Sequence, residues 1–178
     1  RGLIRHRTIQ AIGETAHAGA VDFPYRKDAA LACARFSSRL YDFWQHELSL
    51  GRDLVATTGV IRTSPSASMH KIAGECIVSL DARSLSAAEL NLFEKKVEAI
   101  LQETAEETGV IFKTDPLMRI APVEADEGVM KKLETSADIL KIGTQRMPSG
   151  AGHDAMNFAA AGVPFAMLFV ANRFGSHN

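Results

Sequence analysis

The chain of 178 residues has few cysteines, few aromatic residues and no long apolar run. Its only cysteines, Cys33 and Cys76, can form at most one bridge, which excludes a disulfide scaffold and fits a reducing, cytoplasmic compartment. The longest apolar run, 163–171, is about half of the ~20 residues that a membrane-spanning helix needs. The sequence therefore indicates a protein without a membrane segment.

The chain also has no excess of charge of one sign, because it contains 20 Lys and Arg residues and 21 Asp and Glu residues. This balance argues against a chain that holds nucleic acid or an anionic membrane by bulk charge. The metal-binding spacings H-x-D, H-E-x-x-H and C-x-x-C are absent from the chain. The chain begins at Arg1 and stops abruptly at Asn178, so we expect it to be a piece of a longer protein.

The elements of the first two thirds are predicted from hydrophobic spacing and turn residues. The serine and glutamate of an S-x-x-E capping box, Ser86 and Glu89, mark the start of the second helix, and Gly109 marks its end. In the strand before it, residues alternate so that Ser79, Asp81 and Arg83 share the polar face. The expected order is a strand over 7–16, a loop over 17–25, a helix over 26–50, strands at 54–62 and 75–83, a helix over 86–108 and a strand from 110.

This order of strand, helix, two strands, helix and strand is typical of a ferredoxin-like sandwich, predicted here for residues 6–117. Residues 118–178 follow a different pattern: helices over 124–141 and 154–161, a glycine-rich turn between them, and a buried strand over 163–171. Because an α/β sandwich needs several βα units, this part is interpreted as the end of a larger domain. The fold class is α/β (α+β).

Three of the six histidines lie in segments whose residues are not typical of a buried core. His17 stands in the loop A-H-A-G, although a lone loop histidine is more often solvated or capping than functional. His153 follows Gly152 in S-G-A-G-H-D, where small residues before a helix let amides approach an anion and Asp154 is expected to cap the helix. An ordinary glycine-rich connection explains this loop equally well. His177 follows the predicted buried strand and is a candidate metal ligand.

Two further residues are candidates for binding a carboxylate. Arg83 has a planar guanidinium that suits a carboxylate if it faces a cleft, although a surface ion pair is the commoner role. His70 lies 13 residues before Arg83, and the two would converge if the intervening turn folds back. His6 and His46 carry less weight, and His46 is expected at the surface of the first helix.

Together these segments resemble the hydantoinase/carbamoylase group of metal-dependent amidohydrolases, within the aminoacylase-like metallopeptidase superfamily. The resemblance rests on motifs that occur in order along most of the chain: GETAHAG, RKDAALACARF, AGECIVSLDARS, MPSGAGHDAMNFAAAGVPFAMLFV and the closing GSHN. It implies a two-domain enzyme that hydrolyses linear C–N amide bonds of N-carbamoyl amino acids or related ureido acids. Two divalent metal ions, zinc or manganese, are implied as cofactors.

The resemblance also implies a role for each candidate residue. His17 would reach the active site of the partner subunit in a homodimer formed through the ferredoxin-like (lid) domain, and Arg83 would bind the substrate carboxylate. The substrate site would include His70, Gly152 and His153, and a metal ion would be held by His177.

The chain departs from the family pattern at two places in the pocket: Ala20-Val21-Asp22-Phe23 replaces Thr-Thr-Pro-Met, and His70 replaces an asparagine. The family's H-x-D, paired-glutamate and H-I-E-Q-G motifs, which supply the other metal ligands and the general base, are absent. Two alternatives therefore stay open. One is an aminoacylase or peptidase of the same superfamily, and the other is that this chain alone is an inactive dimerisation and substrate-recognition module.

Overall fold

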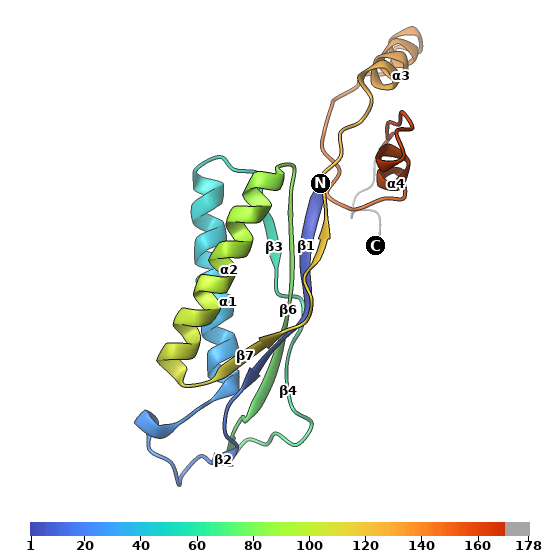
Figure 1. The fold of residues 1–178 in the computed structure, drawn as a ribbon. Helices are drawn as coiled ribbons and strands as arrows, with labels where there is room; N and C mark the ends of the chain where they lie inside the picture. Colours follow the sequence, from blue (N-terminus) through green and yellow to red (C-terminus); the bar gives the residue numbers. More distant parts are fainter. Residues whose placement is uncertain (170–178) are drawn as a thin grey trace. The chain divides into compact units, whose positions relative to one another are not determined.

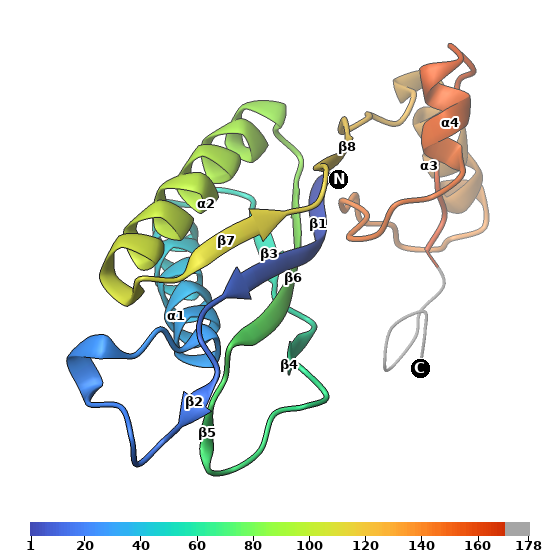
Figure 2. The same cartoon turned by 60° about the horizontal axis from the view of Figure 1, so that its bottom comes forward.

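A computed structural model describes residues 1–169 and divides the chain into two compact units, Arg1–Pro122 and Val123–Asn178. The first unit is a mixed α/β structure in which two helices lie against one face of an antiparallel sheet (Figures 1 and 2). Its main elements, in chain order, are β1 Gly2–Ile12, α1 Ala29–Ser49, β3 Val55–Thr57, β4 Ile61–Thr63, β6 Glu75–Ser84, α2 Ala87–Thr108, β7 Ile111–Thr114 and β8 Met118–Ile120.

The sheet has the order β3-β6-β1-β7, with β4 also paired to β6 and β8 to β1. The long central pair, β1 and β6, runs in register from Gly2 opposite Ser84 to Ile12 opposite Glu75, with an irregularity between His6 and Ile9. A smaller sheet pairs β2, Ala16–His17, with β5, Lys71–Ile72, and a short 3₁₀ helix, Phe23–Tyr25, follows β2.

The core of this unit lies between the helices and the sheet. Strand β6 alternates as predicted, with every second side chain buried and Ser79, Asp81 and Arg83 on the opposite face. From the helices, the largest fully buried side chains include Phe36 on α1 and Phe93 on α2. Packing of apolar helix stripes on one sheet face therefore holds this unit together.

The helix signals are confirmed with one change. Ser86 accepts a hydrogen bond from the Glu89 amide at 3.3 Å, and Gly109 ends α2 with a left-handed φ of 66°. The Glu89 carboxylate, however, accepts from the Ser84 hydroxyl at 2.7 Å, while the same hydroxyl receives the Ser86 amide at 3.0 Å. In a capping box the Glu89 carboxylate would accept the Ser86 amide directly, whereas here the Ser84 hydroxyl lies between the two groups.

Strand boundaries differ more from the predictions. The first strand begins at Gly2, and the run over 54–62 divides into β3 and β4 on either side of Gly59, although both pieces pair with β6. Strand β8 has only three residues, and it places residues up to Pro122 with the first unit. Its pairing with β1, from Leu3 opposite Ile120 to Arg5 opposite Met118, is what holds it there.

Within residues 123–169, the described part of the second unit, there are two helices, α3 Glu127–Ile139 and α4 Ala155–Ala160. The expected strand over 163–171 is not present in its described part, because residues 163–169 have no strand pairing. An isolated apolar run has no neighbour that can accept and donate the ladder of hydrogen bonds that defines a strand. None of the helices in residues 1–169 is long and apolar enough to span a membrane.

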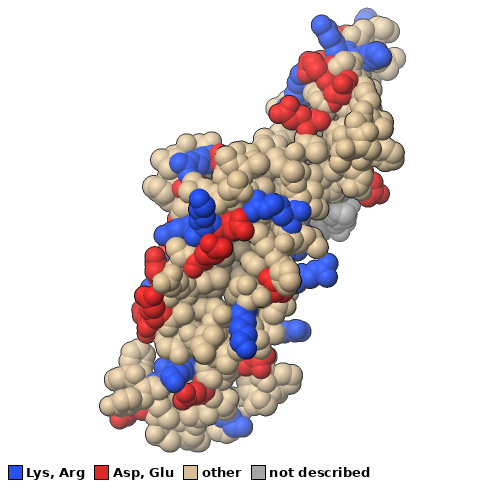
Figure 3. All heavy atoms as spheres, in the orientation of Figure 1, with Lys and Arg blue, Asp and Glu red and all other residues tan. Residues whose placement is uncertain are grey.

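Positive and negative side chains are mixed on the face of the molecule drawn in Figure 3. Ion pairs of the first unit include Arg1 with Asp53, and Arg39 with Glu107 on the two helices. This mixing agrees with the near-zero net charge of the chain.

Candidate functional site

Two of the predicted site residues, His17 and His70, meet at one end of the first unit. The short β2–β5 ladder places His17 opposite Lys71, and the Ala18 amide donates to the His70 carbonyl at 2.9 Å. As a result, the two imidazole rings lie with centroids 5.7 Å apart and planes tilted by 42°. Both side chains are exposed, so the pair is presented to solvent at the tip of the unit.

The loop after His17 is held in a defined turn. The Ala20 amide donates to the His17 carbonyl at 3.0 Å, and the Gly19 amide donates to His17 Nδ1 at 3.1 Å. The Arg26 guanidinium then donates to the carbonyl of Ala18 and, at 2.9 Å, to that of Val21. The A-H-A-G segment is thus ordered by its own backbone and by one arginine.

Arg83 lies near the carboxyl end of β6, where Asp81 holds it. The Arg83 Nε donates to Asp81 Oδ1 at 2.6 Å, and Arg5 on β1 donates its Nε to Asp81 Oδ2 at 2.8 Å. Burial raises the pKa of Asp81, but the hydrogen bonds and charges of Arg83 and Arg5 outweigh it and leave that pKa below its usual value. One ionised carboxylate therefore orients two guanidinium groups.

Sequence reasoning gave Asp81 no role beyond a place on the polar face of its strand. The signal was available, because the period of 2 in D-x-R puts both side chains on one face, where they are close enough to pair. The second arginine could not be found in this way, since its contact depends on the register that sets Arg5 opposite Asp81.

The imidazole pair and Arg83 lie at opposite ends of the sheet. His70 precedes β5 and β6, whereas Arg83 is the ninth residue of β6, and eight residues of strand span about 26 Å. Figures 1 and 2 show the end that carries β2 far from the amino-terminal end of β1, beside which Arg83 is paired. The condition for convergence of His70 with Arg83 within one chain is therefore not met, because β6 is extended between them.

In the second unit, His153 contacts Ser149 across the glycine-rich loop. The Ser149 hydroxyl lies 2.9 Å from the Ala151 carbonyl, to which it donates, and 2.7 Å from His153 Nε2. Gly152, between them, has no left-handed backbone. Asp154 occupies the position before α4, but its side chain makes no capping hydrogen bond because its backbone is already helical, so the predicted cap is wrong.

A metal site is not formed by the described residues. In residues 1–169 no three or more His, Cys, Asp or Glu side chains are grouped so that they could hold a metal ion. His177, the predicted metal ligand, lies outside the described residues. The described donor set thus does not fit a two-metal centre by itself.

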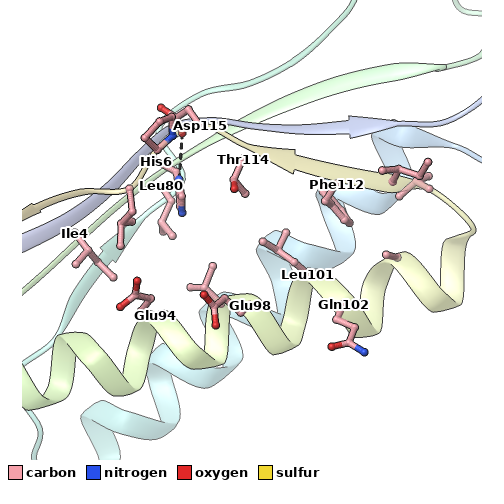
Figure 4. A pocket seen from close by; sticks show the side chains of 16 residues that line it. Ile4, His6, Leu80, Glu94, Glu98, Leu101, Gln102, Phe112, Thr114 and Asp115 are labelled. Atoms are coloured by element: carbon pink, nitrogen blue, oxygen red, sulfur yellow. Dashed lines mark hydrogen bonds and ion pairs between the residues drawn. The ribbon is translucent and has the colours of Figure 1, made fainter.

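A groove of about 810 Å³ runs between α2 and β7, and none of the predicted site residues lines it (Figure 4). Its floor is apolar, and at one side His6 Nδ1 lies 3.1 Å from Asp115 Oδ1. The Asp115 carboxylate also accepts the amides of Arg7 and Thr8 at 3.1 and 3.2 Å, where the β1 register is irregular. This cluster fixes a strand irregularity and is not part of the candidate site.

Comparison with known proteins points to one class of enzyme. No family model matches the chain. An allantoate amidohydrolase of Escherichia coli is 30% identical over 175 residues, which are 98% of this chain and 41% of that protein. An N-carbamoyl-L-amino-acid amidohydrolase of Paenarthrobacter aurescens is 27% identical over 97% of this chain and 40% of its own length. The chain thus spans about 40% of the length of these relatives, which are amidohydrolases.

Solved structures agree with the sequence relatives. A hydantoinase/carbamoylase family amidase from Burkholderia ambifaria matches 93% of this chain and 39% of its own with 30% identity and a TM-score of 0.78. One from Burkholderia vietnamiensis matches 92% of this chain and 38% of its own with 25% identity and a TM-score of 0.81. The chain is therefore a homologue of the hydantoinase/carbamoylase family amidases, as its motifs predicted.

Proposed function

We propose that this protein takes part in hydrolysis of a linear C–N amide bond in N-carbamoyl amino acids or related ureido acids. The observation that carries the proposal is the match over nearly the whole chain to amidohydrolases named for allantoate and N-carbamoyl-L-amino acids. The placement of Arg83 and His17 supplies two roles that such a reaction needs, a clamp for the substrate carboxylate and a donor for the tetrahedral oxyanion.

Arg83 is the carboxylate clamp. Its Nε donates to Asp81 Oδ1 at 2.6 Å and one terminal nitrogen donates to Asp81 Oδ2 at 3.4 Å, so the ion pair restricts the orientation of the planar guanidinium, a group whose fork of donors suits a carboxylate. A preset orientation reduces the entropy that is lost when a substrate binds. Asp81 acts in this scheme as a positioning residue and does not touch the substrate.

His17 is the oxyanion donor, and it serves the site of a partner chain. An N-carbamoyl amino acid is about as long as two extended residues, about 7 Å, whereas the ends of the sheet that carry His17 and Arg83 are about 26 Å apart. One substrate can therefore contact both residues only if they come from two chains. We infer a homodimer, formed through a ferredoxin-like domain whose proposed topology is supported by the strand order β7-β1-β6-β3.

Metal ions belong to the proposal through the family resemblance alone. When bound, two divalent ions would lower the pKa of a water molecule and supply the hydroxide that attacks the amide carbon. The described residues hold no ligand set for them, so we assign this chain only binding, orientation and oxyanion stabilisation.

The first experiment measures release of amine or ammonia by the full-length protein to which this chain belongs, with zinc or manganese, from a panel of N-carbamoyl and N-acyl amino acids. We expect turnover of carbamoyl or ureido acids, and Arg83→Met to raise KM by about 10- to 100-fold, as loss of a charge-assisted pair implies. Arg62→Met, at an exposed position of β4, is the matched control. No release from any carbamoyl substrate would refute the proposal, and turnover of N-acyl substrates alone would favour the aminoacylase alternative.

The second experiment tests the shared site by mixing variants that are each strongly impaired at substrate concentrations below the wild-type KM. If His17 and Arg83 of different chains form one site, His17→Ala mixed with Arg83→Met yields one intact site in each heterodimer, restoring about a quarter of the activity in a random mixture. His17→Ala mixed with His70→Ala restores nothing, because both residues lie at the same end. A monomer by light scattering at micromolar concentration, or no restoration in the first mixture, would contradict the dimer.

A further inference from the structure

The hydrogen bond from Gly19 to His17 bears on where the imidazole carries its proton. The Gly19 N–H donates to His17 Nδ1 at 3.1 Å, two residues along the chain. A ring nitrogen that accepts a hydrogen bond has no proton of its own, so a neutral imidazole in this contact carries its proton on Nε2. The opposite tautomer would set one N–H against another.

We propose that the backbone amide of Gly19 is a positioning group that fixes His17 as the neutral tautomer protonated at Nε2. The imidazole is then a preset hydrogen-bond donor at its outer nitrogen. The catalytic meaning of this rests on the proposed function, in which that nitrogen faces a developing oxyanion, whereas the tautomer itself is a property of this chain.

The surrounding turn keeps the donor amide in place. The bond from Ala20 to the His17 carbonyl closes the turn that contains Gly19, and Arg26 holds the Ala18 carbonyl from outside. The amide is therefore ordered before any ligand arrives. A donor fixed in this way needs no reorganisation at the moment when negative charge develops.

The same bond disfavours two other roles for His17. A metal ion or a proton taken up at Nε2 requires that nitrogen to have a free lone pair, which means moving the ring proton to Nδ1 and losing the Gly19 bond. The geometry thus favours a donor over a metal ligand or a general base. His70 is a second group that can influence the ring, since its own ring lies 5.7 Å away.

Position 19 offers a matched pair of variants. A Cβ added there would meet His17 Nδ1 at 3.4 Å and Cε1 at 3.5 Å, which is ordinary contact, and the backbone φ is not left-handed. Gly19→Ala therefore keeps the N–H and the turn. Replacing Gly19 by glycolic acid, which exchanges the amide for an ester, removes the N–H and keeps the size.

The ester variant can be prepared because a synthetic segment 1–32 can be joined to residues 33–178 by thioester ligation at Cys33. The synthetic segment also carries ¹⁵N in the His17 ring alone. In the unmodified chain above pH 8, the ¹⁵N spectrum should show an unprotonated Nδ1 and a protonated Nε2. A predominant Nδ1–H tautomer would overturn the proposal.

The comparison of variants gives the size of the effect. Loss of the Gly19 N–H should raise the ratio of Nδ1–H to Nε2–H tautomer about fivefold relative to Gly19→Ala, the factor expected for one net hydrogen bond. His70→Asn should leave the ratio unchanged. The proposal fails if the ester and alanine variants have the same ratio, or if His70→Asn alone changes it as much.

The fold and the activity are read separately. Trp44 fluorescence reports whether the ligated chain has refolded. Its ring nitrogen donates to the Leu54 carbonyl at 2.8 Å, and neither residue belongs to the turn around Gly19. In an active preparation the ester should lower kcat with little change in KM, because the fixed Nε2–H donor of His17 acts on the transition state and not on the bound substrate. The tautomer result stands even if no amidohydrolase activity is found, so the two proposals fail independently.

Discussion

The two units contain similar helices but differ in what those helices bury. Helix α1 of the first unit has six buried residues, including Phe36, whereas α3 of the second unit is also amphipathic and has none. No residue in 123–169 is buried. The first unit has a six-stranded sheet against which its helices pack, while residues 123–169 contain no strand.

This difference separates what makes a helix from what makes it stable. Both α1 and α3 begin at an aspartate whose side chain accepts a backbone amide, so the local signals are alike. Most of the stability of a helix in a protein comes from burial of its apolar face, and only the first unit provides that burial within its described residues. We therefore expect the first unit to carry the cooperative unfolding transition.

The strongest test of this comparison replaces one phenylalanine in each unit. Phe36→Ala removes a fully buried ring and should lower the free energy of unfolding by about 3–5 kcal/mol. Phe158→Ala, on α4, removes a ring that is 57% exposed and should change it by less than about 0.5 kcal/mol. Urea denaturation followed by Trp44 fluorescence measures both, and equal losses would show that the second unit has a core of its own.

A second test concerns Asp115 in the first unit. Its carboxylate accepts the Arg7 and Thr8 amides and contacts His6, so Asp115→Ala should cost about 2 kcal/mol through amides left without an acceptor. Asp42→Ala, at an exposed position of α1, is the control and should cost little. A loss no larger than that of the control would show that the β1 irregularity is held without this carboxylate.

The contribution of Asp115 should also depend on pH. Burial raises its pKa, but the hydrogen bonds from Thr8, His6 and Arg7 outweigh burial and lower the pKa below the ordinary 3.8. A group whose pKa is lowered by folding stabilises the fold above its unfolded pKa, and this stability is lost as pH falls through the folded pKa. The difference between the wild type and Asp115→Asn should thus be constant from pH 7 to about 5 and shrink below about pH 4. A difference that grows on acidification would contradict this assignment.

The sequence predicted elements whose signals are local. The alternation in β6, the start of α2 at Ser86 and its end at Gly109 all depend on residues within a few positions, and each was found. Strand β8 was missed because its three residues become a strand only through pairing with β1, more than 110 residues away. The predicted strand over 163–171 fails in its described part for the converse reason: apolar residues alone do not supply a partner.

The candidate site shows the same limit. The A-H-A-G loop and the D-x-R face were recognisable, but the contact of His17 with His70 requires the β2–β5 pairing, and the role of Asp81 requires the register with Arg5. The 13 residues from His70 to Arg83 are enough for a turn that folds back, but they form β5 and the extended strand β6 instead. Residues 75–83 are nine of the ten residues of β6, so this segment is extended and holds Arg83 far from His70.

The smallest effect is expected at the starts of α1 and α4, which differ in whether the aspartate before the helix accepts a backbone amide. Asp28 accepts the Ala30 and Leu31 amides at 3.0 and 3.1 Å, so Asp28→Ala should lower the free energy of unfolding by about 1 kcal/mol. Asp154 makes no such bond at α4, so Asp154→Ala should leave the stability unchanged within error. Asp28→Asn is the conservative control, because an amide oxygen can still accept these bonds. A loss of stability on Asp154→Ala as large as that on Asp28→Ala would mean that Asp154 caps α4 in solution, as Asp28 caps α1.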